Sequence, residues 1–95
     1  MDSIFEDKIG RIILLPADRI KHIYKHPEMQ NRIYLVEKTI REYDFIEEDL
    51  NISKSIYYYK YFKEFKRNIM VVVKLKENCG YILTAYMVEK WKLKN

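Results

Sequence analysis

The sequence has little glycine, proline or cysteine, and each shortage excludes a class of protein. Two glycines and two prolines in 95 residues are too few for a fibrous repeat or a flexible linker. The single cysteine, Cys79, excludes an intramolecular disulfide, and no Cys/His spacing of the zinc-finger type occurs. No apolar run approaches the roughly 20 residues that span a bilayer, and the N-terminus lacks the basic and apolar regions of a secretory signal. We therefore expect a cytoplasmic protein without a disulfide or a membrane segment.

The chain does contain enough apolar material for one folded domain. Hydrophobic residues make up 48% of the sequence and charged residues 34%, a balance typical of globular domains rather than disordered tails. A chain of this length buries roughly 60 to 65% of its unfolded surface, which suffices for one sheet covered by one or two helices. We expect residues 1–95 to form a single domain.

Charge is distributed unevenly along the chain, although the net value is only +4. Residues 1–52 hold 8 Lys and Arg and 11 Asp and Glu, a net charge of −3, whereas residues 53–95 hold 10 and 3, a net charge of +7. Many of these cations alternate with tyrosines. Cations neutralise phosphates and aromatic rings stack on unpaired bases, so the mixture is suited to RNA. It is also typical of a solvated sheet face whose tyrosines pack in the core.

The apolar periodicity predicts an α+β fold in which two N-terminal helices pack on one face of an antiparallel meander of three or four strands. Residues 11–16 predict a short strand or an extended lead-in, because Pro16 keeps Leu15 out of the helical region. The first helix follows and ends near His26, before Pro27, and the second covers about residues 30–43. Strands are predicted over residues 55–62, 68–76 and 80–88. Residues 45–52 form either an edge strand or a turn, because their acidic run does not suit a sheet interior.

In the last predicted strand the side chains alternate between the two faces. One face carries Ile82, Thr84, Tyr86 and Val88, and the other carries Tyr81, Leu83, Ala85 and Met87. A threonine among apolar neighbours needs a hydrogen-bond partner if it is buried, and otherwise faces a cleft. Thr84 is therefore a candidate site residue.

Arg19, His22 and His26 are spaced three and four residues apart, so in a helix they form one polar stripe. An unperturbed imidazole titrates near pH 6.5, which suits proton exchange at neutral pH. The helix dipole at the C-terminus favours a protonated His26, which would then act as an acid, with His22 as base or substrate-orienting group. Both histidines are also compatible with a purely structural role.

Other chemistries fit the sequence less well. A metal site built from His22, His26 and Glu28 is disfavoured because Pro27 breaks the helix between the ligands. A Ser/His/Asp or Cys/His triad lacks the glycines of a nucleophile elbow, and Cys79 has no identifiable base. We therefore expect neither a metal nor a cofactor.

Two segments resemble a known superfamily. The first is Arg19-Ile-Lys-His22-Ile-Tyr-Lys-His26-Pro-Glu28, and the second is Ile82-Leu-Thr84-Ala-Tyr86. In this order around a predicted meander, they resemble the phage-type nuclease domains of the barnase, EndoU, colicin and RelE superfamily, over roughly residues 13–90.

The resemblance implies a metal-independent endoribonuclease, often a toxin or an effector of mobile elements, with an antitoxin or immunity protein as partner. In this chemistry a base deprotonates the ribose 2′-OH, which attacks the adjacent phosphorus, and an acid protonates the departing 5′ oxygen. A cyclic phosphate remains. By position, His22 and His26 would handle the protons, Arg19 would hold the phosphate, Thr84 would donate a hydrogen bond to it, and Tyr86 would support Thr84.

In-line displacement places acid and base on opposite sides of the phosphorus, whereas an i,i+4 pair projects from one side. We therefore expect one catalytic histidine and a partner from the sheet, namely Thr84, Tyr86 or Lys74. Basic residues of the second half would bind RNA as well, among them Lys60, Lys63 and Arg67. The alternative is a non-catalytic RNA- or protein-binding module of the same fold.

Overall fold

The computed structural model describes residues 2–89 of the chain. Lys90, Lys92 and Lys94, which add to the basic charge of the second half, lie outside the described residues, as does the aromatic residue Trp91 between them. The elements are β1 (Ser3–Glu6), β2 (Ile12–Leu15), α1 (Ala17–Ile23), a 3-10 helix η1 (Pro27–Met29), α2 (Ile33–Arg41), β3 (Phe45–Asp49), β4 (Ser55–Phe62), β5 (Arg67–Lys76) and β6 (Cys79–Val88).

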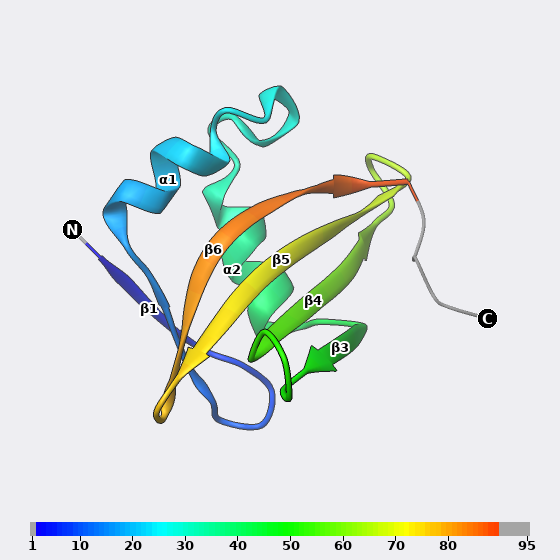
Figure 1. The fold of residues 1–95 in the computed structure, drawn as a ribbon. Coiled ribbons are helices and arrows are strands. Elements are labelled where there is room, and N and C mark those ends of the chain that lie inside the picture. Colours follow the sequence, from blue (N-terminus) through cyan, green and yellow to red (C-terminus); the bar gives the residue numbers. More distant parts are fainter. Residues whose placement is uncertain (1, 90–95) are drawn as a thin grey trace.

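The strands form one mixed sheet of six strands in the order β1-β2-β6-β5-β4-β3 (Figure 1). Neighbouring strands are antiparallel except β2 and β6, which run parallel over a short register that pairs Ile12 with Cys79 and Leu14 with Tyr81. The prediction of a three- or four-stranded antiparallel meander is therefore wrong. The meander β3 to β6 exists, but the N-terminal hairpin β1–β2 extends the sheet beside β6.

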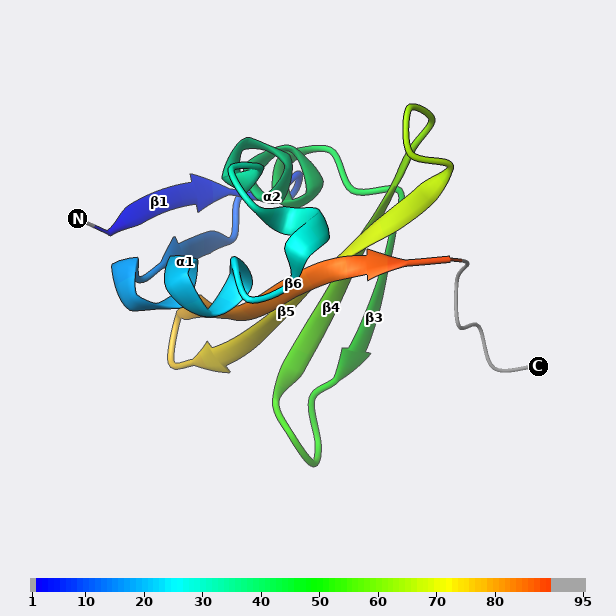
Figure 2. The same ribbon diagram turned by 90° about the horizontal axis from the view of Figure 1, so that it is seen from above.

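One face of the sheet carries the hydrophobic core beneath α2. Figure 2 shows α2 on this side of the sheet and no helix of residues 2–89 on the opposite side. The fully buried core side chains include Ile13, Ile56, Val71 and Ile82 from four neighbouring strands. We call the opposite side the open face; its strand residues include Tyr57, Met70, Val72, Lys74, Thr84 and Tyr86, which lie in register across β4, β5 and β6.

The α1–η1 segment covers the edge of β6 that β2 leaves free. Because β2 pairs with β6 only as far as Tyr81, no strand of residues 2–89 lies on that side of the later part of β6. Figure 1 shows α1 beside this part of the strand, and the carboxylate of Glu28 accepts the backbone N–H of Met87 at 3.3 Å. Ile23 and Met29 are fully buried and anchor the segment in the core.

A β-bulge in β6 changes the faces expected from simple alternation. Val72 pairs with Thr84 but Val73 pairs with Ile82, so Leu83 is an additional residue. Such an extra residue exchanges the faces to which the side chains point on one side of the bulge. Ile82 therefore shares the core face with Ala85, both fully buried, and Tyr81 shares the open face with Thr84. The predicted grouping of Ile82 with Thr84, and of Tyr81 with Ala85, is wrong.

No helix within residues 2–89 is long and apolar enough to cross a membrane.

Candidate functional site

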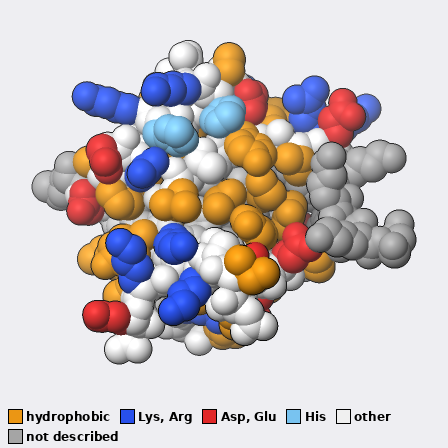
Figure 3. All heavy atoms as spheres, viewed as in Figure 1, with side chains coloured by type: hydrophobic (Ala, Val, Ile, Leu, Met, Phe, Trp, Pro, Cys, Tyr) orange, Lys and Arg blue, Asp and Glu red, His pale blue; other side chains and the backbone are white. Residues whose placement is uncertain are grey.

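The open face combines an apolar, aromatic centre with polar rims. Figure 3 shows hydrophobic side chains across the middle of this face, with both histidines at its upper edge and a group of Lys and Arg side chains at its lower left. Tyr57, Met70, Val72, Leu83 and Tyr86 are only half-buried there. This half-exposed surface, bordered by two imidazoles and by Lys and Arg side chains, is the candidate site.

His26 and Tyr86 meet at the upper rim although 60 positions separate them in the sequence. Their ring centroids lie 5.0 Å apart with an interplanar angle of 57°, and both side chains are half-buried. His26 stands beyond the end of α1, with φ −85° and ψ 111°, and its N–H donates to the carbonyl of Ile23 at 3.0 Å. The extended backbone before Pro27 thus turns the histidine toward the sheet.

Thr84 lies on the same side of β6 as Tyr86, two residues before it. Its Oγ1 is buried and has no hydrogen-bond partner among residues 2–89. Leaving a buried hydroxyl unpaired typically costs about 1–3 kcal/mol, so this atom requires an explanation beyond packing. The hydroxyl has no partner in the described structure, and because its oxygen is covered, a ligand can reach it only after the side chain rotates.

His22 and Arg19 lie on α1, where His22 is exposed and Arg19 half-buried. The helix ends at Ile23, three residues earlier than predicted, so the expected helical i,i+4 relation of His22 and His26 does not hold. The two histidines nevertheless lie close to each other on the rim seen in Figure 3. The direction of the His22 side chain is therefore set by the helix, and that of His26 is set independently by the turn.

Four predicted cationic residues, from β4, the β4–β5 turn and β5, lie in three different places. Lys74 lies on the open face, where its Nζ donates to the carbonyl of Ser53 at 2.6 Å. Lys60 lies on the opposite side, with Nζ 3.8 Å from a carboxylate oxygen of Asp44. Lys63 and Arg67 are exposed residues in and after the β4–β5 turn. The structure therefore brings only Lys74 of these four to the face that carries Thr84 and Tyr86.

The tyrosines of β4 also divide between the faces. Tyr58 is buried in the core, whereas Tyr57, Tyr59 and Tyr61 belong to the open side. Burial and the neighbouring Glu47 carboxylate raise the pKa of Tyr59 to about 12, and its hydroxyl donates to Glu47 at 3.4 Å. Because Tyr59 is only 3% exposed, only Tyr57 and Tyr61 of this strand offer accessible rings.

Glu28 is a residue of this region whose role the sequence analysis missed. Its contact with the N–H of Met87 joins the turn carrying His26 to the strand carrying Thr84 and Tyr86. The sequence indicates Glu28 as part of the segment that resembles the nuclease superfamily and as a disfavoured metal ligand, and its place directly after His26-Pro27 is the signal for a contact near His26. This hydrogen bond links the two segments that carry the candidate site residues.

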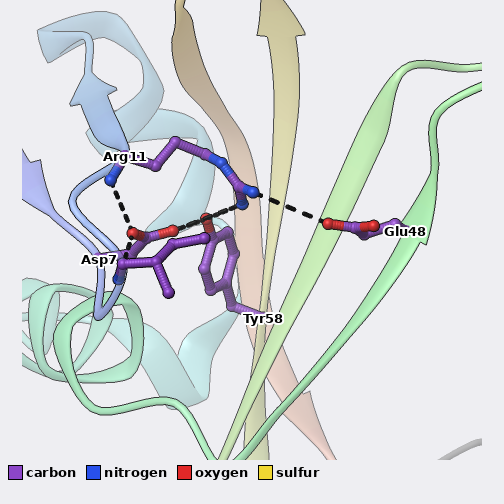
Figure 4. A network of polar contacts seen from close by, with 5 residues as sticks. Asp7, Arg11, Glu48 and Tyr58 are labelled. Atoms are coloured by element: carbon purple, nitrogen blue, oxygen red, sulfur yellow. Dashed lines mark hydrogen bonds and ion pairs between the residues drawn. The ribbon is translucent and has the colours of Figure 1, made fainter.

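A second polar cluster, also missed, lies on the core side of the sheet (Figure 4). The Asp7 carboxylate accepts the Tyr58 hydroxyl at 2.7 Å, the backbone N–H groups of Arg11 and Ile9 at 2.8 and 3.1 Å, and an Arg11 guanidinium N–H at 3.4 Å. Glu48 lies 3.8 Å from the same guanidinium. Burial and the bond to Asp7 raise the pKa of Tyr58 well above its usual value. The cluster fixes the β1–β2 loop on β4 and is closed to substrates, since the Asp7 side chain is completely buried.

Residues 2–89 hold no group of three or more His, Cys, Asp or Glu side chains arranged to bind a metal ion. Comparisons with protein-family models, with curated proteins and with solved structures find no match to this chain.

Proposed function

We propose that the chain is an endoribonuclease that cleaves RNA on the open face by attack of the ribose 2′-OH, without a metal ion. The observation that carries the proposal is the meeting of His26 and Tyr86 at 5.0 Å, beside the unpaired hydroxyl of Thr84. A proton-exchanging ring and a phenol on one half-exposed rim, with an unpaired hydroxyl covered beside them, supply the groups that phosphoryl transfer by general acid–base catalysis requires.

Each group has a distinct role in this chemistry. His26 takes the proton from the 2′-OH or returns it to the departing 5′ oxygen. Thr84 donates a hydrogen bond to a non-bridging phosphate oxygen, where negative charge accumulates. The oxygen of Thr84 is covered in the free protein, so this contact requires a change of χ1, and no existing hydrogen bond has to be broken for it.

The second proton-transfer group must approach the phosphorus from the other side. His22 meets this condition better than a residue of one continuous helix would, because α1 ends at Ile23 and the turn positions His26 separately. Lys74 does not meet it, because it pairs with Tyr81 and its ammonium is held at Ser53, whereas His26 contacts Tyr86, five residues further along β6. Arg19, on the same helix as His22, supplies positive charge toward the phosphate. An antitoxin or immunity protein would inhibit the enzyme by covering the open face and its basic lower rim.

The proposal predicts cleavage of a DNA oligonucleotide that contains one ribonucleotide, in the presence of EDTA. The single 2′-OH is the only nucleophile of the required kind, so mass spectrometry should find one cut that leaves a 2′,3′-cyclic phosphate at that position. The all-DNA oligonucleotide serves as the control and should stay intact. No cleavage, or cleavage that EDTA abolishes, would refute the proposal and leave a non-catalytic RNA-binding face as the alternative.

A further inference from the structure

The β-bulge in β6 places a second aromatic residue on the open face, next to the candidate site. Tyr81 pairs with Leu14 of β2 and with Lys74 of β5, whose side chains belong to this face. Without Leu83 as an additional residue, Tyr81 would point into the core. The bulge therefore aligns Tyr81 with Thr84 and Tyr86 along one strand.

Tyr81 lies among cations. The ammonium of Lys76 stands 5.6 Å from the centroid of its ring, and Lys74 is its direct partner across β5. The Lys74 ammonium is held at the carbonyl of Ser53, which leaves two of its three N–H donors for another acceptor. An exposed cation–π contact such as that of Lys76 is weak, so a base can replace the ammonium over the ring while the ammonium moves to a phosphate.

We infer that Tyr81, Lys76 and Lys74 form a second nucleotide subsite, which takes an unpaired base on the Tyr81 ring and the adjoining phosphate on the two ammonium groups. The inference rests on the proposed function, because it gives the RNA a path across the open face. Tyr81 lies three residues from Thr84, roughly 10 Å along the strand, so a nucleotide near the scissile phosphate reaches it. A base inside a duplex has no free face for such stacking, and the substrate is therefore single-stranded at this position.

Charge on the other edge of the sheet favours the same path. Glu47 and Asp49 of β3 lie on the open side, opposite Tyr57 and Ser55, and would repel a phosphate backbone that crossed toward β3. The cations at the β5–β6 end attract it. RNA should thus run from the histidine rim along β6 toward Lys76.

The test is binding of 2′-O-methyl oligonucleotides, which cannot be cleaved by 2′-OH attack, measured by fluorescence anisotropy over lengths from two to six nucleotides. The wild type should gain about tenfold in affinity at the length that first reaches Tyr81, a typical effect of one stacked base. Tyr81→Leu should lose this gain and Tyr81→Phe should keep it. Tyr61→Leu is the matched control, because it removes an exposed ring (45% exposed) near the β4–β5 turn, away from Tyr81. Lys76→Ala should reduce the salt dependence of oligonucleotide affinity by about one phosphate contact.

Equal affinity of Tyr81→Leu and wild type at every length would overturn the subsite, and so would the absence of any oligonucleotide binding by the wild type. If the tenfold gain in affinity appears and depends on Tyr81, but the single-ribonucleotide substrate remains uncut in EDTA, the subsite is supported and the proposed catalysis is refuted. Binding of duplex and single strands with equal affinity, unaffected by Tyr81→Leu, would indicate purely electrostatic contact and would also overturn it.

Discussion

Replacing His26 by alanine should lower the rate of RNA cleavage by about 10²- to 10⁴-fold, the usual contribution of a general acid or base. The side chain is half-buried and makes one ring contact, with Tyr86, so the fold should survive. The rate is measured as kcat/KM on the single-ribonucleotide oligonucleotide, and folding by urea denaturation. Tyr34→Ala is the control, since this exposed ring belongs to α2 on the opposite side of the sheet.

Thr84→Val and His22→Ala extend the same experiment. Valine keeps the shape of threonine but removes a buried hydroxyl that has no partner in the described structure, so stability should stay equal or rise while cleavage falls. Loss of both stability and cleavage would instead indicate a structural hydroxyl. His22→Ala should leave stability unchanged because the side chain is exposed. Retention of wild-type cleavage by all three variants would remove these residues from the mechanism.

The largest effect on stability should come from Asp7→Ala, which we expect to lower the free energy of unfolding by about 3–5 kcal/mol. The substitution leaves the Tyr58 hydroxyl, the Arg11 guanidinium and two backbone N–H groups without their buried acceptor. Urea denaturation measures the change. RNA binding by the folded fraction should persist, because the cluster lies on the core side of the sheet.

Two variants make this prediction specific. Glu48→Gln weakens only a partly exposed pair at 3.8 Å and should change stability by less than about 1 kcal/mol. Tyr58→Phe should lower the free energy of unfolding by less than Asp7→Ala and by more than Glu48→Gln, because the Asp7 carboxylate keeps its other donors. A loss below about 1 kcal/mol for Asp7→Ala would show that water or a rearranged loop satisfies these groups, contrary to the described packing.

Local sequence signals predicted most of the elements. Proline at position 16 and the apolar spacing predicted where α1 begins. The Val, Ile and Tyr runs predicted β4, β5 and β6 to within one residue of their observed bounds. The acidic segment at 47–49 was expected in an edge strand or in a turn, and β3 is an edge strand. These features depend on side-chain alternation and backbone preference, which are local properties.

Pairing between distant segments was not predictable in the same way. The four-residue strands β1 and β2 are too short to show alternation, and nothing in Ile12–Leu15 indicates a parallel partner near Cys79. The bulge at Leu83 follows from the register of β6 on β5, which no pattern within β6 reveals. For this reason simple alternation assigned Tyr81 to the wrong face, and the predicted sheet had too few strands.

The candidate site shows the same division. Its residue types were chosen from chemistry and from the resemblance of the His22–Glu28 and Ile82–Tyr86 segments to a nuclease superfamily, and the structure brings His26, Thr84 and Tyr86 to one face. Lys60 was chosen from composition alone, and it lies on the other side of the sheet beside Asp44. The face on which a charged side chain lies depends on whether its position in the strand is odd or even, and composition carries no information on position.

The proposed function requires above all that RNA contact the rim where the turn after α1 meets β6. An NMR titration of the ¹⁵N-labelled protein with a 2′-O-methyl trinucleotide tests this directly. We expect the largest amide shifts at His26, Thr84 and Tyr86, smaller ones at Tyr81 and none at the Asp7 cluster. Shifts confined to the β4–β5 turn around Lys63 and Arg67, or to α2, would contradict it.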